Sequence, residues 1–234
     1  MSEFSSPARD AASAAALELI EPGMAIGLGS GRAVWRVVER MAERWPDGAP
    51  VDVVVASERT AEQVRSQLGL EPRELDGELR LDLALDGADE VDPELRLVKG
   101  GGGALLREKI VVSAASRFVV VAETTKRVTR LGEEFRLPVE VVRFAWRDTR
   151  RRLAALLPDS ELRLSEDGKP FVTDEGHLLL DCALAHDADP ERLDRGLNEI
   201  PGVVEHGLFV GVTERALLGT PEGELEVLKS PTRP

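Results

Sequence analysis

The chain has 234 residues, of which 42% are hydrophobic and 31% charged, a composition that argues against collagen, disorder and coiled coil and favours a globular protein. Thirty basic against 43 acidic residues give a net charge of −13, which argues against nucleic acid and anionic lipid as partners. There is no apolar run of the roughly 18 residues that a membrane span needs. The single Cys182 and the acidic residues near the N-terminus favour the cytoplasm over secretion, so we expect a cytoplasmic protein that binds neither nucleic acid nor membrane.

The first 131 residues predict helices and strands in alternation. In chain order these are a helix over 8–20, a strand that runs into a glycine-rich turn, a helical pattern with Val34, Val37, Val38 and Met41, a strand over 51–56, a helix between Ser57 and Gly69, a strand that ends at Asp86, a helix after the glycines 100–103 and a strand over 117–123. Strands that alternate with helices pair in parallel, so this part predicts an α/β sheet.

The pattern changes near residue 132. A strand after Pro138, an Arg-rich helix, two strands within 161–184, a helix over 190–200 and a strand over 203–210 give the order β-α-β-β-α-β. We therefore expect a small α+β domain over residues 132–206. The rest of the chain, 1–131 and 207–234, is expected to form the larger domain.

The segment GLGSGRAV, residues 27–34, is a glycine-rich turn between a strand and a helix. Backbone N–H groups and the helix dipole bind phosphate at such turns. The spacing does not match the dinucleotide pattern, because Arg32 stands where a glycine is needed, and no Gly-Lys-Ser/Thr follows for ATP. The alternative is a tight turn that only connects packed elements, but Ser30 and Arg32 favour an anion site.

The segment DGADEVD, residues 86–92, places Asp86 at the carboxyl end of a buried strand, with Asp89 and Glu90 just beyond it. Ligands of open α/β sheets bind at that edge. Clustered carboxylates also suit hard cations, but the spacing does not match a calcium loop and includes no histidine, so no metal is predicted. The alternative is an acidic, solvated turn in which Asp86 caps the residues after it.

The segment KGGGGALLREKI, residues 99–110, contains four consecutive glycines. Ordering them costs backbone entropy, which a simple connection would avoid and a close approach to a ligand requires. Lys99 supplies a cation before the glycines, and Glu108 lies in the first turns of the helix after them. Glu108 would otherwise be a surface carboxylate, but its closeness to the glycines favours a functional role.

In this order, these segments together with LGEEFRLPVEV, IPGVVEHGLF and LLGTPEGELEVL resemble the type A ribose-5-phosphate isomerases over nearly the whole chain. That family interconverts D-ribose 5-phosphate and D-ribulose 5-phosphate in the non-oxidative pentose phosphate pathway, without a metal or organic cofactor. The resemblance implies a Rossmann-like parallel-sheet domain that carries a smaller ferredoxin-like α+β domain. It also implies a sugar phosphate substrate and a homodimer or homotetramer.

The resemblance implies that Glu108 is the base that transfers the proton, with Asp86, Asp89 and Lys99 around the reacting end of the sugar. It implies further substrate-binding residues at Arg9, Ser30, Gly31, Arg32, Ala33, Gly87, Ala88, Gly100, Gly101, Gly102 and Lys126. The commoner family turn reads Gly-Thr-Gly-Ser-Thr, so Arg32 and Ala33 replace two hydroxyl residues. Arg32 either binds the phosphate in their place or points away.

Two other functions stay open from the residues. A sugar-phosphate sensor without catalysis would use the same fold, because fold does not fix function. An acyl-CoA transferase of related architecture would need a nucleophilic glutamate and a CoA site. The acids and Lys99 favour the isomerase over the sensor.

Overall fold

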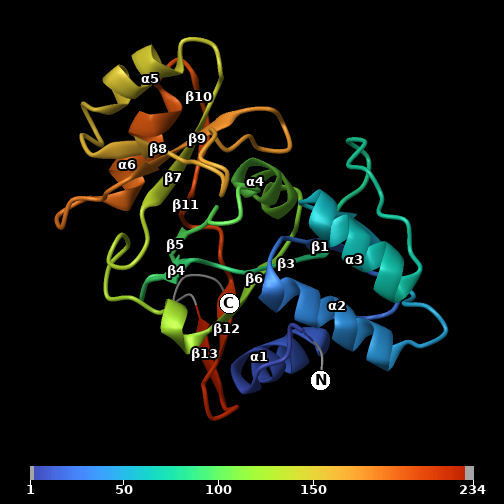
Figure 1. Cartoon of the computed structure of the whole chain (residues 1–234). Coiled ribbons are helices and arrows are strands. Elements are labelled where there is room, and N and C mark those ends of the chain that lie inside the picture. Colours follow the sequence, from blue (N-terminus) through green and yellow to red (C-terminus); the bar gives the residue numbers. More distant parts are fainter. Residues whose placement is uncertain (1–2, 230–234) are drawn as a thin grey trace. The chain divides into compact units, whose positions relative to one another are not determined.

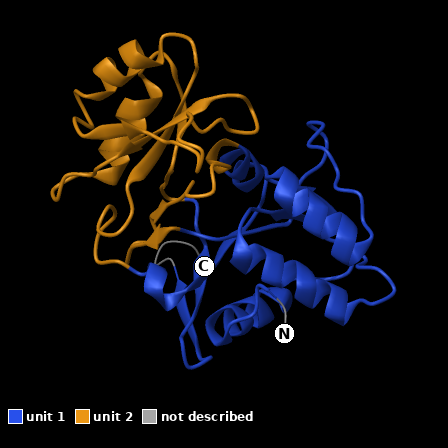
Figure 2. Cartoon of the chain, in the orientation of Figure 1, with its two compact units in different colours: residues 1–88, 107–127, 212–234 blue, residues 89–106, 128–211 orange. Residues whose placement is uncertain are grey.

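The computed structural model describes residues 3–229, and its chain divides into two compact units (Figure 2). Unit 1 comprises the residues up to Ala88, Arg107–Arg127 and the residues from Val212 onward. Unit 2 comprises Asp89–Leu106 and Val128–Gly211. The chain therefore passes from one unit to the other within two of the segments that the sequence singles out, after Ala88 and after Leu106.

Unit 1 is built on a six-stranded sheet with the order β13-β12-β6-β3-β1-β2 (Figure 1). Its strands are β1 Ala25–Leu28, β2 Asp52–Val55, β3 Leu83–Asp86, β6 Phe118–Glu123, β12 Arg215–Gly219 and β13 Leu225–Lys229. All neighbours pair in parallel except β13, which pairs antiparallel with β12. The predicted α/β class is confirmed. Of the C-terminal residues expected in the larger domain, β12 and β13 join this sheet, whereas residues 207–211 group with unit 2.

Three helices cover one face of this sheet: α1 Pro7–Leu17, α2 Arg32–Arg44 and α3 Glu58–Leu68. Their apolar side chains form one core with Ile26, Leu28 and inward residues of β2, β3, β6 and β12. Side chains alternate along a strand, so Gly27 faces the other side. A Cβ atom there would lie 2.4 Å from Val111 Cγ1 of α4 Leu105–Ser113, and only glycine lets that helix pack so closely.

Local signals explain where these helices begin and end. Ser57 is the N-cap of α3 and accepts a hydrogen bond from Thr60 N, and Gly69 ends the helix in the left-handed conformation with φ +64°. Ser6 caps α1 in the same way through Arg9 N. The short 3₁₀ helix η1 Thr124–Lys126 follows β6 directly.

Unit 2 contains a four-stranded antiparallel sheet with the order β10-β7-β9-β8. Its elements in chain order are β7 Leu137–Val141, α5 Trp146–Leu153, β8 Ser160–Leu162, β9 Leu178–Cys182, α6 Pro190–Asn198 and β10 Val203–His206. This is the predicted β-α-β-β-α-β order. The helices pack their leucines on one face of the sheet, where Cys182 is fully buried, and burial raises the pKa of its thiol to about 12.

A three-stranded sheet with the order β11-β5-β4 completes unit 2. It consists of β4 Glu90–Val91, β5 Leu97–Val98 and β11 Leu208–Phe209. The sequence pattern places residues 89–106 with the larger domain, whereas they group with unit 2 in the structure because β5 pairs with β11. Within residues 3–229, no helix is both long and apolar enough to span a membrane.

Candidate functional site

The carboxyl ends of β1, β3 and β6 meet at one edge of the sheet of unit 1, because these neighbouring strands run in parallel. The glycine-rich turn follows β1, Asp86 ends β3, and Lys126 ends the 3₁₀ turn after β6. Open α/β sheets bind their ligands at this edge. The structure thus brings together three of the predicted positions that lie up to 96 residues apart, from Ser30 to Lys126.

Asp86 is buried, with 1% of its surface exposed, and holds the glycine-rich turn. Its Oδ1 accepts hydrogen bonds from Ser30 N at 3.1 Å and from Gly87 N at 2.7 Å. A Cβ atom at Gly29 would lie 1.8 Å from Asp86 Cγ, so glycine is required there. The solvated acidic turn considered as an alternative is therefore wrong for Asp86.

The turn itself leaves room for a ligand. Gly31 is the N-cap of α2, with φ +108°, and a Cβ atom there would meet nothing within 4 Å. Because glycine has no side chain, Gly31 does not cap the first backbone N–H groups of α2. Uncapped N–H groups at a helix N-terminus bind anions. Arg32 begins α2 with an exposed side chain, and Ala33 is half-buried. Gly87 and Ala88, after β3, are also half-buried.

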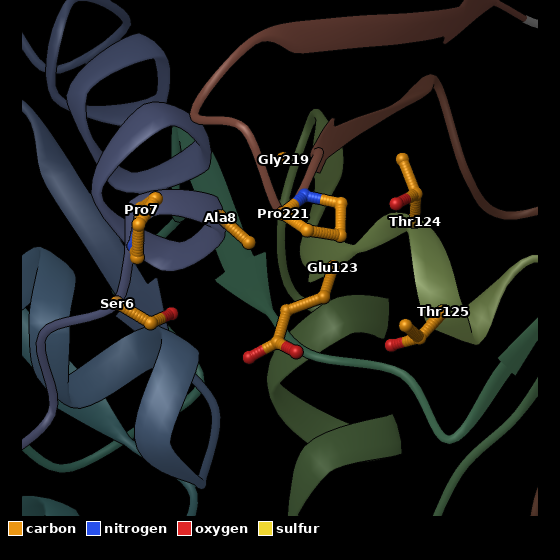
Figure 3. A pocket seen from close by; sticks show the side chains of 8 residues that line it. All are labelled: Ser6, Pro7, Ala8, Glu123, Thr124, Thr125, Gly219 and Pro221. Atoms are coloured by element: carbon orange, nitrogen blue, oxygen red, sulfur yellow. The ribbon is translucent and has the colours of Figure 1, made fainter.

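Arg9 of α1 lies beside the carboxyl end of β6, where its guanidinium is bound within the protein. Its Nε donates to Glu123 Oε1 at 2.8 Å, and one terminal nitrogen donates to Phe4 O at 2.6 Å. A cavity of about 240 Å³ lies at this end of β6 and β12 (Figure 3). Its lining comprises Ser6, Pro7, Ala8, Glu123, Thr124, Thr125, Gly219 and Pro221.

Glu108 is only 5% exposed, on the first turns of α4. Its neighbour Arg107 instead reaches the surface of unit 1 and pairs with Glu58 at 3.0 Å. The alternative of an ordinary surface carboxylate is therefore wrong for Glu108. A glutamate is seldom buried in this way unless packing or chemistry requires it.

In unit 2, the predicted cation Lys99 is 3% exposed and is held between backbone and an aromatic ring. The backbone N–H of Lys99 donates to Gly207 O at 2.8 Å, and the side-chain Nζ lies 5.4 Å from the centre of the Phe209 ring. A Cβ atom at Gly207 would lie 2.1 Å from Lys99 O, so glycine is needed for this approach.

Three of the four glycines after Lys99 have a structural reason. Gly100 and Gly103 adopt φ +104° and +85°, and a Cβ atom at Gly103 would lie 2.5 Å from the Phe171 ring. Gly101 N donates to Asp89 Oδ2 at 2.7 Å. A Cβ atom at Gly102 would meet nothing within 4 Å, which leaves its backbone open to a ligand. The predicted glycine loop and Asp89 are thus joined directly.

The other two acids of the 86–92 segment anchor backbone, a role that the sequence does not reveal. Glu90 is fully buried and accepts hydrogen bonds from the N–H groups of Gly132, Glu134 and Phe135 at 2.5–2.8 Å. Asp92 binds Arg96 N and Nε, although burial is the largest effect on its carboxyl and raises the pKa. Within residues 3–229, no group of three or more His, Cys, Asp or Glu side chains is placed to hold a metal ion.

Sequence reasoning also missed a group of side chains under the glycine-rich turn. Trp35, Ser57 and Thr60, on or beside α2 and α3, form hydrogen bonds that reach Gly29 and Ser30. The N-cap position of Ser57 was the one local signal, and it indicates a cap rather than a contact with a turn 27 residues away.

Comparison with known proteins agrees with the resemblance. A family model described as ribose 5-phosphate isomerase A (phosphoriboisomerase A) matches residues 52–223. The chain is 52% identical over 214 residues to the ribose-5-phosphate isomerase A of Roseiflexus castenholzii, with 91% of each chain covered.

Solved structures give the same result for the fold. The ribose 5-phosphate isomerase A of Methanocaldococcus jannaschii superposes with a TM-score of 0.87 and 34% identity, over 94% of this chain and 97% of that one. A D-ribose-5-phosphate isomerase solved in complex with phospho-erythronic acid gives a TM-score of 0.87 and 32% identity, over 94% and 97% of the two chains.

Proposed function

Because the chain belongs to the ribose 5-phosphate isomerase A family and is an aldose–ketose isomerase that interconverts D-ribose 5-phosphate and D-ribulose 5-phosphate, we propose that Glu108 is its catalytic base. The buried carboxylate of Glu108, 5% exposed directly after the glycine loop, is the observation that carries this assignment.

The reaction needs one proton to move between two carbons. Glu108 removes the proton from C2 of the open-chain aldose, which leaves an enediolate, and returns it to C1 as the carbonyl forms at C2. The hydroxyl proton passes between O2 and O1. A single carboxylate performs both carbon transfers, so no cofactor is required by this route.

Lys99 and the two aspartates are assigned to the oxygens of the reacting end. The buried Lys99 ammonium stabilises the negative charge that develops on the carbonyl oxygen as the enediolate forms. Asp86 exchanges protons with the sugar oxygens, including during ring opening, and Asp89 lies at the same reacting end. Both carboxylates already accept backbone N–H bonds, from the glycine-rich turn and from Gly101, which supports fixed orientations for them.

Backbone and basic side chains are assigned to the rest of the substrate. The proposed binding residues are Arg9, Ser30, Gly31, Arg32, Ala33, Gly87, Ala88, Gly100, Gly101, Gly102 and Lys126. Open space beside Gly31 and Gly102 supports this set. A dianionic phosphate that enters a chain of net charge −13 needs local cations, and Arg9, Arg32, Lys99 and Lys126 supply them.

A coupled assay that measures ribulose 5-phosphate formed from ribose 5-phosphate tests the function directly. We expect turnover with ribose 5-phosphate and competitive inhibition by phospho-erythronic acid, the ligand of a related isomerase. Binding of ribose 5-phosphate without turnover would favour a sensor, and transfer between acyl-CoA donors would favour a transferase.

The remaining expectations concern the cellular setting. We propose that the protein works in the cytoplasm, in the non-oxidative pentose phosphate pathway, as a homodimer or homotetramer. Light scattering coupled to size-exclusion chromatography tests the assembly, and a monomer at assay concentration would contradict it.

A further inference from the structure

A chain of hydroxyl groups runs beneath the glycine-rich turn of unit 1. Ser30 Oγ lies 3.0 Å from Ser57 Oγ, which lies 3.0 Å from Thr60 Oγ1. Thr60 Oγ1 donates to Gly29 O at 2.8 Å and accepts from Trp35 Nε1 at 3.0 Å. Thr60 is fully buried, and Ser57 and Trp35 are each 6% exposed.

Counting protons fixes the direction of this chain. A hydroxyl group has one proton and two lone pairs. The Thr60 proton goes to Gly29 O, so its two lone pairs accept from Trp35 Nε1 and from Ser57. Ser57 therefore uses its proton on Thr60, and its own lone pairs accept from Thr60 N at 3.2 Å and from Ser30.

The opposite direction is unfavourable. If Ser57 donated to Ser30, the contact between Ser57 and Thr60 would have no proton unless Thr60 turned away from Gly29 O. Gly29 is buried, and a buried carbonyl that loses its donor destabilises the fold. The Gly29 carbonyl can only accept a hydrogen bond. Its position at one end of the chain of hydroxyl groups therefore makes Ser30, at the other end, the donor to Ser57.

We infer that the Ser30 hydroxyl meets the substrate as a hydrogen-bond acceptor, and so recognises a hydroxyl group of the sugar and not the phosphate. The Ser30 hydroxyl donates its proton to Ser57, so only its lone pairs can contact the substrate. A phosphate dianion has no proton to donate to these lone pairs, whereas a sugar hydroxyl group has one. Ser57 and Thr60 are then positioning residues that set this specificity. The inference rests on the proposed role of Ser30 in substrate binding.

The test compares two ligands, ribose 5-phosphate as substrate and inorganic phosphate as competitive inhibitor. For Ser30→Ala we expect the KM for ribose 5-phosphate to rise about 2- to 10-fold, the loss of one hydrogen bond. The inhibition constant of phosphate should change less than about 2-fold, since no bond to phosphate is lost.

Breaking the chain should free Ser30 to donate. In Thr60→Val, Ser57 has lost its acceptor and turns its proton to Ser30, so phosphate should bind more tightly, by about 2- to 10-fold. Structural damage would weaken phosphate binding and not strengthen it.

Thr60→Ser keeps the hydroxyl and should behave as wild type. Thr149→Val, at a buried threonine of unit 2, is the control, and Ser57→Ala breaks the same chain if Thr60→Val does not fold.

Two results would overturn the inference. If Ser30→Ala weakens phosphate and ribose 5-phosphate by the same factor, Ser30 donates to the phosphate, although its place in the site stands. If Ser30→Ala changes neither, Ser30 does not contact the substrate. Turnover by the wild-type enzyme in the same assay keeps the isomerase function separate from both results.

Discussion

Asp86 accepts the backbone N–H of Ser30 at 3.1 Å, so the carboxylate assigned to the sugar oxygens also holds the turn assigned to the substrate. The bond joins the ends of two neighbouring parallel strands, β1 and β3. Loss of the carboxylate would therefore disturb both functions together. Substitutions at Glu108, Lys99 and Arg32 separate the roles more cleanly.

Replacing Glu108 by glutamine should abolish turnover while the affinity for ribose 5-phosphate stays nearly unchanged. The amide keeps the shape of the buried side chain but accepts no proton, and loss of a general base costs about 10²- to 10⁴-fold in rate. Steady-state kinetics and calorimetric binding measure the two effects. Glu58→Gln, at an exposed carboxylate, is the control. Retention of more than about a tenth of kcat, against that expected loss, would refute the assignment.

Lys99→Met should lower kcat far more than it raises KM. Methionine keeps the buried stem without the charge, and the loss of one oxyanion donor costs about 10²-fold or more in kcat. Wash-out of deuterium from C2-labelled substrate should slow along with turnover. Lys169→Met, at an exposed lysine, is the control and should change neither kcat nor KM. If Lys99→Met turns over slowly but releases deuterium at the wild-type rate, Lys99 acts in a step after the proton is removed.

Arg32→Ala should raise KM, because we propose that this exposed residue at the start of α2 binds the phosphate in place of the missing hydroxyl groups. Phosphate binding also orients the reacting end, so kcat should fall as well. Arg44→Ala, at the other end of α2, is the matched control. An unchanged kcat/KM at low salt would mean that backbone N–H groups bind the phosphate without Arg32.

Activity should survive dialysis against EDTA. Each of the four acids of residues 86–92 accepts at least one backbone N–H bond, so at least one oxygen of each already has a partner that a cation would have to displace. Assays before and after chelation, with metal analysis of the dialysed protein, provide the measurement. Activity that disappears with EDTA and returns with one divalent ion would make these carboxylates metal ligands.

Acid should remove the contribution of the Arg117–Glu214 pair to stability. The Arg117 hydrogen bond at 2.7 Å lowers the pKa of Glu214 below its ordinary 4.5. The pair therefore stabilises the fold above that value and stops doing so as pH falls through the lowered pKa. Since Arg117 is 38% exposed, we expect at most about 1 kcal/mol.

Thermal unfolding of wild type and Arg117→Met across pH measures this effect. The gap in Tm should be present at pH 7 and close as the pH falls below the lowered pKa of Glu214, where the carboxyl is protonated in both states. Arg65→Met, in the exposed Arg65–Glu71 pair, serves for comparison. A gap that stays constant across pH would assign the effect of Arg117 to packing.

Much of the fold could be predicted because its signals are local. Ser57 begins α3 with a side-chain cap and Gly69 ends it in the left-handed conformation, and mostly apolar strands of four to six residues mark the sheet of unit 1. Strands β4 and β5 could not be found, because each has two residues, and the strand predicted over 203–210 divides into β10 and β11, which belong to different sheets. The pairing of β5 with β11 joins segments more than 100 residues apart, which no local pattern encodes.

The structure gives the surroundings of the predicted site residues, and their roles stay predictions. Burial confirms that Glu108 is no surface carboxylate, but the resemblance and not the spacing assigns its chemistry. Glu90 was expected just beyond the ligand-binding edge, whereas it and Asp92 anchor loops. The partners of Glu90 are N–H groups 42 to 45 residues away, and a backbone donor has no signature in a sequence.

The burial of Cys182 provides a way to follow unit 2 by itself. The chain has one cysteine, its pKa is about 12, and the thiolate that reacts with thiol reagents forms only when the core of β9 opens to water. The rate of labelling in native buffer therefore reports local opening of that core. Within unit 2, the proposed substrate contacts are Asp89, Lys99 and Gly100–Gly102. Adding ribose 5-phosphate to the labelling reaction would measure how strongly substrate binding at these residues slows the opening of the core around Cys182.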